Sequence, residues 1–141
     1  MTREPIIAAL FAKLAAIPSL VTVGRVVKHL IDVPAEHQPA LFLSPRNQSA
    51  IRRTGLPTKW VISVLVYIYT NRGGQNVIPD IQMNAILDAV ETVLAPNGGV
   101  ENQTLGGLCE YCRIEGVIET DEGALGDQSV AIVPIDILVT T

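Results

Sequence analysis

Apolar residues recur at helical spacing in two segments of the chain. In residues 3–17 they follow an i, i+3 and i+4 pattern, which ends at Pro18 because proline disfavours helical backbone in the residue before it. Residues 80–95 repeat the pattern, and the run Pro-Asn-Gly-Gly at residues 96–99 stops it. The sequence therefore predicts two helices, each with an apolar face that docks on other elements.

Alternating β-branched and apolar residues predict strands before and between these helices. Residues 20–27 and 39–43 are two short candidates. Residues 58–70 give the strongest pattern, because both faces of a strand formed there would be apolar. We expect this strand to be central, covered on both sides within the chain or on one side by another subunit.

The C-terminal third has the pattern of a β-hairpin. Residues 109–120 alternate between polar and apolar, residues 121–127 have the composition of a turn, and residues 129–139 return with one apolar face. Pro134 has no N–H for a ladder hydrogen bond, so the returning strand is expected to lie at a sheet edge or to carry a bulge there.

The predicted order of elements is α-β-β-β-α-β-β. Strands joined by hairpins and interrupted by helices are typical of the α+β class, here with a mainly antiparallel sheet of about five strands and two helices packed on one face. The length fits a single domain spanning residues 1–141. Residues 44–57, which are polar and basic, are expected to form a long loop, and long loops in compact domains are usually functional or disordered.

Charge is distributed unequally along the chain. Residues 1–60 hold eight of the ten Lys and Arg residues, whereas residues 61–141 hold eleven of the fourteen Asp and Glu residues. If the fold keeps these charges on separate surfaces, the chain can bind copies of itself head-to-tail, and such contacts close into a ring when the rotation allows. The alternative is that the two halves interleave and leave a mixed surface. A net charge of −4 does not favour binding to nucleic acid, and no apolar run is long enough to span a membrane.

The two cysteines, Cys109 and Cys112, form a single CxxC motif. A structural zinc site needs four ligands, and the only histidines, His29 and His37, lie far upstream. A thioredoxin-like motif would stand at the start of a helix, whereas this one stands in a predicted strand. Residues three apart in a strand point to opposite faces, so we expect one buried and one exposed thiol. A small metal-binding or redox protein is therefore the weakest of the functions considered.

Candidate chemistry elsewhere in the chain is sparse. Neither histidine stands in a nucleophile motif, and the glycine pairs lack the spacing of a phosphate-binding loop. The acids around residues 119–127 lack the spacing of an EF-hand and are expected to form a solvated turn. We therefore expect no catalytic residue, no metal and no cofactor, and we expect the chain to function by assembly with other proteins.

Five segments together resemble a known protein family. They are REPIIAALFAKLAAI at 3–17, VPAEHQPALFL at 33–43, PDIQMNAILDAVETVLAP at 79–96, LGGLCEYCRIEG at 105–116 and LGDQSVAIVPIDILV at 125–139. This combination resembles the tail-terminator proteins of long-tailed bacteriophages, also called tail completion or minor tail proteins. The likeness spans nearly the whole chain and depends on the general pattern, with no single diagnostic motif.

The resemblance implies a non-enzymatic α+β subunit of a hexameric ring in the virion, at the head-proximal end of the tail. Such a ring caps the growing tail tube, ends its polymerisation and presents a surface to the head. The implied partners are further copies of the chain, the major tail-tube protein and the head–tail connector or neck protein, with synthesis in the host cytoplasm. Related rings of similar fold serve as head–tail joining proteins, and that alternative stays open.

The charge pattern suggests how such a subunit would meet its neighbours. We expect basic residues of the 44–57 loop to face acidic residues near the C-terminal turn of a neighbouring subunit or of the tube end. The candidate residues for this interface are Arg46, Arg52, Arg53, Glu119, Asp121 and Glu122. Exposed ion pairs contribute little affinity, so these charges would set orientation, and burial of apolar surface would supply the binding energy.

Overall fold

The computed structural model describes residues 1–71, 78, 80–96, 102–125 and 127–141, without the side chains of 80 and 122–125. It contains two α-helices, two short 3₁₀ helices and six strands. The helices are α1 (Arg3–Ala15) and α2 (Asp80–Val93), with the 3₁₀ turns at Leu30–Asp32 and Ala35–His37. The strands are β1 (Thr22–Gly24), β2 (Ala40–Ile51), β3 (Lys59–Asn71), β4 (Tyr111–Ile114), β5 (Glu119–Leu125) and β6 (Gln128–Thr140).

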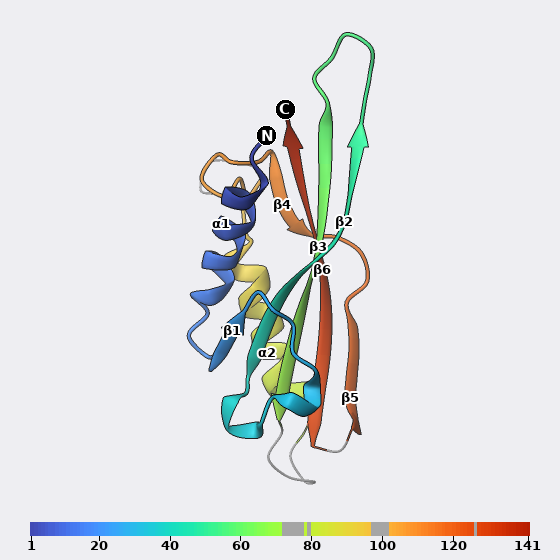
Figure 1. Ribbon diagram of the computed structural model, residues 1–141. Coiled ribbons are helices and arrows are strands. Elements are labelled where there is room, and N and C mark those ends of the chain that lie inside the picture. Colours follow the sequence, from blue (N-terminus) through green and yellow to red (C-terminus); the bar gives the residue numbers. More distant parts are fainter. Residues whose placement is uncertain (72–77, 79, 97–101, 126) are drawn as a thin grey trace.

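The six strands form one sheet, and both helices lie against the same face of it (Figure 1). The order across the sheet is β1-β2-β3-β6-β4, with β5 also paired to β6. Every pairing is antiparallel except that of β1 with β2, which is parallel. The predicted α+β class, with two helices on one face of a mainly antiparallel sheet, is confirmed.

The main core lies between the helices and this face of the sheet. Period-two alternation sends every second residue of β3 and β6 to the helices, and the helix residues that meet them recur every three or four positions. The core residues from these four elements are Ile6, Leu10, Leu14, Ile62, Val64, Val66, Ile68, Met83, Ile86, Val90, Ala131, Val133, Ile135, Ile137 and Val139.

The predicted strand over residues 109–120 is interrupted, because β4 and β5 are two separate partners of the same edge of β6. Pro134 lies opposite the interruption, and its carbonyl accepts a hydrogen bond from the Glu115 N–H at 3.1 Å. The N and C=O of one strand residue point to the same side, so the missing N–H of Pro134 also faces this break. The expectation that β6 would be an edge strand or would carry a bulge at Pro134 was wrong. β6 lies inside the sheet, and the irregularity is the break between β4 and β5 opposite this proline.

The predicted 44–57 loop was also wrong in its first part. Residues 44–51, assigned to the 44–57 loop, continue β2, which pairs with β3 up to Ile51↔Lys59. Only residues 52–58 connect the two strands, and the β2–β3 hairpin projects well beyond the rest of the sheet (Figure 1). The predicted strand at 20–27 is reduced to β1, three residues at the edge of the sheet.

The face of the sheet away from the helices is covered at one end only. Residues 28–38, with both 3₁₀ turns, cross this face at the end opposite the projecting hairpin (Figure 1). They close a small second core around Val33, Phe42 and Tyr69, in which the Phe42 and Tyr69 rings lie 5.7 Å apart. The Tyr69 hydroxyl donates to the Lys28 carbonyl at 2.7 Å, and burial raises the pKa of this tyrosine.

Candidate functional site

The uncovered part of this second face, here called the open face, is a sheet surface that no other element covers among the described residues. It is formed by the outward residues of β3 and β6 on the hairpin side of the small core. These residues are Val61, Ser63, Leu65, Pro134, Asp136 and Leu138. All except the buried Pro134 are half-buried, although the inward residues beside them are fully buried. The expectation that β3 is apolar on both faces is confirmed, and the chain itself covers only part of the second face.

Polar side chains occupy the centre of the open face. The Ser63 hydroxyl donates to Asp136 Oδ1 at 2.6 Å, and Arg113 is the β4 residue paired with Asp136. Arg113 stacks 3.9 Å over the Tyr111 ring and donates to Glu115 at 2.9 Å, and this hydrogen bond raises the pKa of the arginine. These contacts hold a polar band between two apolar areas of the sheet.

At the hairpin end, the open face deepens into a groove of about 360 Å³, here called the hairpin groove. Its apolar lining comes from the hairpin and from the three strands that meet below it: Ile51, Leu56, Pro57, Val61, Tyr111 and Leu138. Arg53 and Lys59 stand among these residues and add positive charge. The groove therefore combines an apolar floor with cations, a composition suited to an apolar side chain that has acids nearby.

The N-terminus anchors one side of the hairpin. Arg3, the first residue of α1, donates to the side chain of Gln48 in β2 at 2.6 Å. Its guanidinium also lies 4.9 Å from the centre of the Trp60 ring in β3. Arg3 thus bridges the two strands of the hairpin just where they leave the body of the protein.

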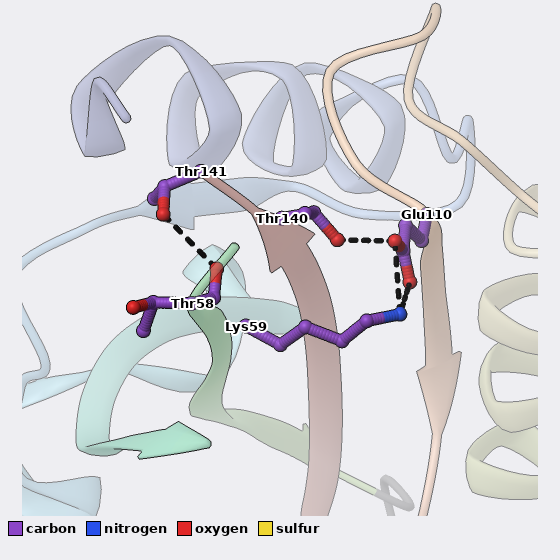
Figure 2. A network of polar contacts seen from close by, with 5 residues as sticks. All are labelled: Thr58, Lys59, Glu110, Thr140 and Thr141. Carbon is purple, nitrogen blue, oxygen red and sulfur yellow. Dashed lines mark hydrogen bonds and ion pairs between the residues drawn. The ribbon is translucent and has the colours of Figure 1, made fainter. Parts of the chain in front are cut away.

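The C-terminus anchors the other side, as Figure 2 shows. Lys59 donates to both carboxylate oxygens of Glu110, at 3.1 and 3.2 Å, and Thr140 donates to the same carboxylate. The hydrogen bond from Thr140, followed by that from Lys59, lowers the pKa of Glu110. The hydroxyl and N–H of Thr141 both donate to the Thr58 carbonyl at 3.0 Å. Both termini therefore hold the base of the hairpin, which fixes the direction in which it projects.

The arginines predicted for the interface lie on this hairpin. Arg52 and Arg53 are in the connection between β2 and β3, and Arg46 stands at a register shift in β2. All three are exposed, and no carboxylate within the described ranges forms an ion pair with any of them. They are available to a partner.

The predicted acids lie at the other end of the sheet. Glu119 and Asp121 are exposed residues of the edge strand β5, and the Glu122 side chain lies outside the described residues. Glu119 pairs with Ile132, whereas the hairpin base is level with Thr140, about eight strand positions or roughly 26 Å away. Arg46 is different, because it borders the same hollow of the open face as Glu119. The structure thus separates Arg52 and Arg53 from the acids and brings Arg46 towards one of them.

The CxxC motif is inside the protein. Cys112 is 1% exposed and Cys109 is 9% exposed, so the expectation of one exposed thiol was wrong. The reason is that Cys109 precedes β4 and lies in a turn, where its N–H donates to the Thr104 carbonyl at 3.2 Å. Burial raises the pKa of Cys109 to about 11 and that of Cys112 to about 12. Both thiols therefore stay protonated at neutral pH, which disfavours nucleophilic and metal-binding roles.

Comparison with known proteins gives a likeness of fold. No family model matches the chain, and no curated protein matches it. Among solved structures, the chain is similar to a chain of the "virion of native gene transfer agent (GTA) particle". That likeness has a TM-score of 0.52 at 14% sequence identity and covers 95% of this chain and 93% of the other. The two chains thus share a fold along nearly their whole lengths. Among the described residues, no helix is long and apolar enough to cross a membrane.

Proposed function

We propose that this protein is a structural subunit of a phage-like virion, forming a ring that caps the tail tube, ends its polymerisation and provides the surface for head attachment. The observation that carries this proposal is the shared fold with a chain of a virion particle over 95% of the length. The resemblance of five sequence segments to tail-terminator proteins supports the more specific role in the tail.

The open face explains how such a subunit would bind other chains. Its half-buried apolar residues gain little within the monomer, and a partner that covers them would bury apolar surface worth about 25 cal/mol per Å². The edge of β2 beyond Phe42 has no partner strand among the described residues and can add one. A ring places each copy between two neighbours, so it can cover both surfaces at once.

The positions of the charges suit a head-to-tail arrangement. Arg52 and Arg53 stand in the connection at the hairpin end, and Glu119 and Asp121 pair with Ile132 and Val130, towards the opposite end of β6. Successive copies, or the subunit and the tail tube, would then meet with opposite charges facing each other. Such charges select orientation and partner more than they add affinity.

Non-enzymatic function is part of the proposal. The most reactive side-chain type in the chain is cysteine, and burial keeps both thiols protonated and away from solvent. Within the described residues, no group of three or more potential ligands is arranged to hold a metal ion. The proposed partners are accordingly proteins: other copies of the chain, the major tail-tube protein and the head–tail connector.

Loss of the protein tests the proposed role. Particles assembled without it should carry overlong tails when viewed by electron microscopy, because nothing stops the tube from growing. Normal tails detached from heads would instead show a head–tail joining ring. Complete particles of normal length and infectivity would contradict both roles.

A charge swap tests the proposed interface. The double substitution Arg52→Glu and Arg53→Glu should abolish capping and lengthen the tails, while the circular dichroism spectrum stays unchanged because both side chains are exposed. The matched control, Arg52→Lys with Arg53→Lys, preserves the charge and should keep tail length normal. Normal tails with the Glu variant would remove these arginines from the interface.

A further inference from the structure

We infer that the hairpin groove of one copy receives Val117 from the loop between β4 and β5 of a second copy. The inference rests on the proposed ring, because it specifies which surfaces of successive copies meet. The occupant is thus a second copy of this chain, bound through one apolar side chain with acids beside it.

The groove presents exposed apolar side chains above a half-buried apolar floor. Leu56 is 60% exposed and Ile51 is 42% exposed, and both stand over the half-buried Val61 and Leu138. The anchors at both termini hold the hairpin in position, so the groove is built before any partner arrives. Preorganisation of this kind lowers the entropic cost of binding.

Val117 is an apolar side chain that the fold leaves exposed on a protruding loop. It is 78% exposed, and its loop bows outward from the edge of the sheet (Figure 1). The interruption opposite Pro134 forces this loop out, and Gly116 allows it with a backbone φ of +111°. The Glu115 N–H, bonded to the Pro134 carbonyl, fixes where the loop leaves the sheet.

Charge favours Val117 over the two other apolar residues of similar exposure, Ile31 and Val26. Glu119 and Asp121 follow it closely, and within the described ranges neither has a cationic partner. They would face Arg53 of the groove, whereas Lys59 is already paired with Glu110 of its own copy.

Val26 is 77% exposed, but both nearby charges are basic: Arg25, which pairs with Glu4, and Lys28, which would repel Arg53. Ile31 is 82% exposed and has Lys28 as well as Asp32 close to it in the sequence, so it carries no net negative charge beside it.

The contact cannot form within one copy. Gly116 packs against Pro134, and the groove lies by Leu138, about four strand positions or roughly 13 Å along β6. A surface on one copy that binds a different surface on the next is a heterologous contact, and repetition of it closes a ring or extends a filament.

Chemical cross-linking between two differently tagged full-length chains tests the contact. One chain carries Leu56→Cys and the other carries Val117→Cys, and a short bismaleimide joins thiols that come within its reach. We expect the mixed pair to cross-link about tenfold more than the controls, since docking raises the local thiol concentration. The buried native thiols should give little background, which the unsubstituted chain measures.

Two controls match the exposure of the substituted residues. Val26→Cys replaces Val117→Cys in the first, and Ile81→Cys, at a residue 63% exposed on α2, replaces Leu56→Cys in the second. Cross-linking of the Leu56–Val117 pair no greater than in these controls overturns the inference. The proposed tail role is tested separately, by the length of tails assembled without the protein. If those tails are overlong but the control pairs cross-link as well as the Leu56–Val117 pair, the tail role is supported and the groove contact is wrong.

Discussion

The two faces of the sheet are formed by alternating residues of the same strands, but they differ in how deeply their side chains are buried. Ile137 in β6 points to the helices and is fully buried, whereas Leu138, the next residue, points to the open face and stays half-exposed. The same contrast separates Ile62 from Val61 in β3. Both faces carry apolar residues, but the open face also has the polar pair of Ser63 and Asp136 at its centre. The helix face holds the fold together, and the open face remains for partners.

The largest expected effect contrasts two neighbouring residues. Ile137→Ala should lower the free energy of unfolding by about 2–5 kcal/mol, because it leaves a cavity in a close-packed core. Leu138→Ala should cost about 1 kcal/mol or less, because solvent already reaches this side chain. Urea denaturation of both variants measures the difference. Equal losses would mean that the open face stabilises the monomer as much as the core does.

The buried thiols on the helix side give a pH-dependent effect of intermediate size. The folded-state pKa of Cys112, about 12, lies above the reference value of 9.0, so only the unfolded chain ionises readily as pH rises. Its contribution is fully present below pH 9 and is lost progressively between pH 9 and 12. At pH 10 the loss should be about 1 kcal/mol.

Comparison with Cys112→Ala isolates this contribution from other alkaline titrations. The decrease in unfolding free energy between pH 8 and pH 10 should be smaller in the variant than in the native chain. A decrease of the same size in both proteins would show that this thiol ionises without unfolding, contrary to its burial at 1% exposure.

The smallest expected effect concerns the anchor of the hairpin. Arg3→Ala removes the hydrogen bond to Gln48 and the cation–π contact with Trp60, which together should stabilise the hairpin by about 0.5–1 kcal/mol. Amide exchange in residues 46–51 should accelerate while exchange in α2 stays unchanged. Arg46→Ala, at an exposed residue outside the anchor, should leave both rates unchanged. Faster exchange throughout the chain would mean that Arg3 supports the whole fold.

Periodicity carried most of the fold prediction. The helices and the strands β3 and β6 were predicted to within a few residues, because each buries one face along most of its length and therefore shows a clear repeat. The outer half of β2 was missed for the opposite reason. It projects from the body with exposed residues throughout, so its sequence is polar and resembles a loop.

Of the candidate site, only the charged residues could be predicted from the sequence. Arg52 and Arg53 stand out in the sequence, and their exposure on the hairpin follows from their place in a polar stretch. The hairpin groove could not be predicted, because it depends on how β2, β3, β4 and β6 come together at one end of the sheet. Its one sequence signal was the second apolar face of β3, which already suggested a covering subunit.

Cryo-electron microscopy of the assembled virion tests the central claim most directly, because it shows what covers each face of the subunit. We predict a ring of this protein at the head-proximal end of the tail, with the open face and the hairpin in contact with other protein chains. A particle without the protein, or a subunit whose open face and hairpin both remain in solvent, would contradict the account.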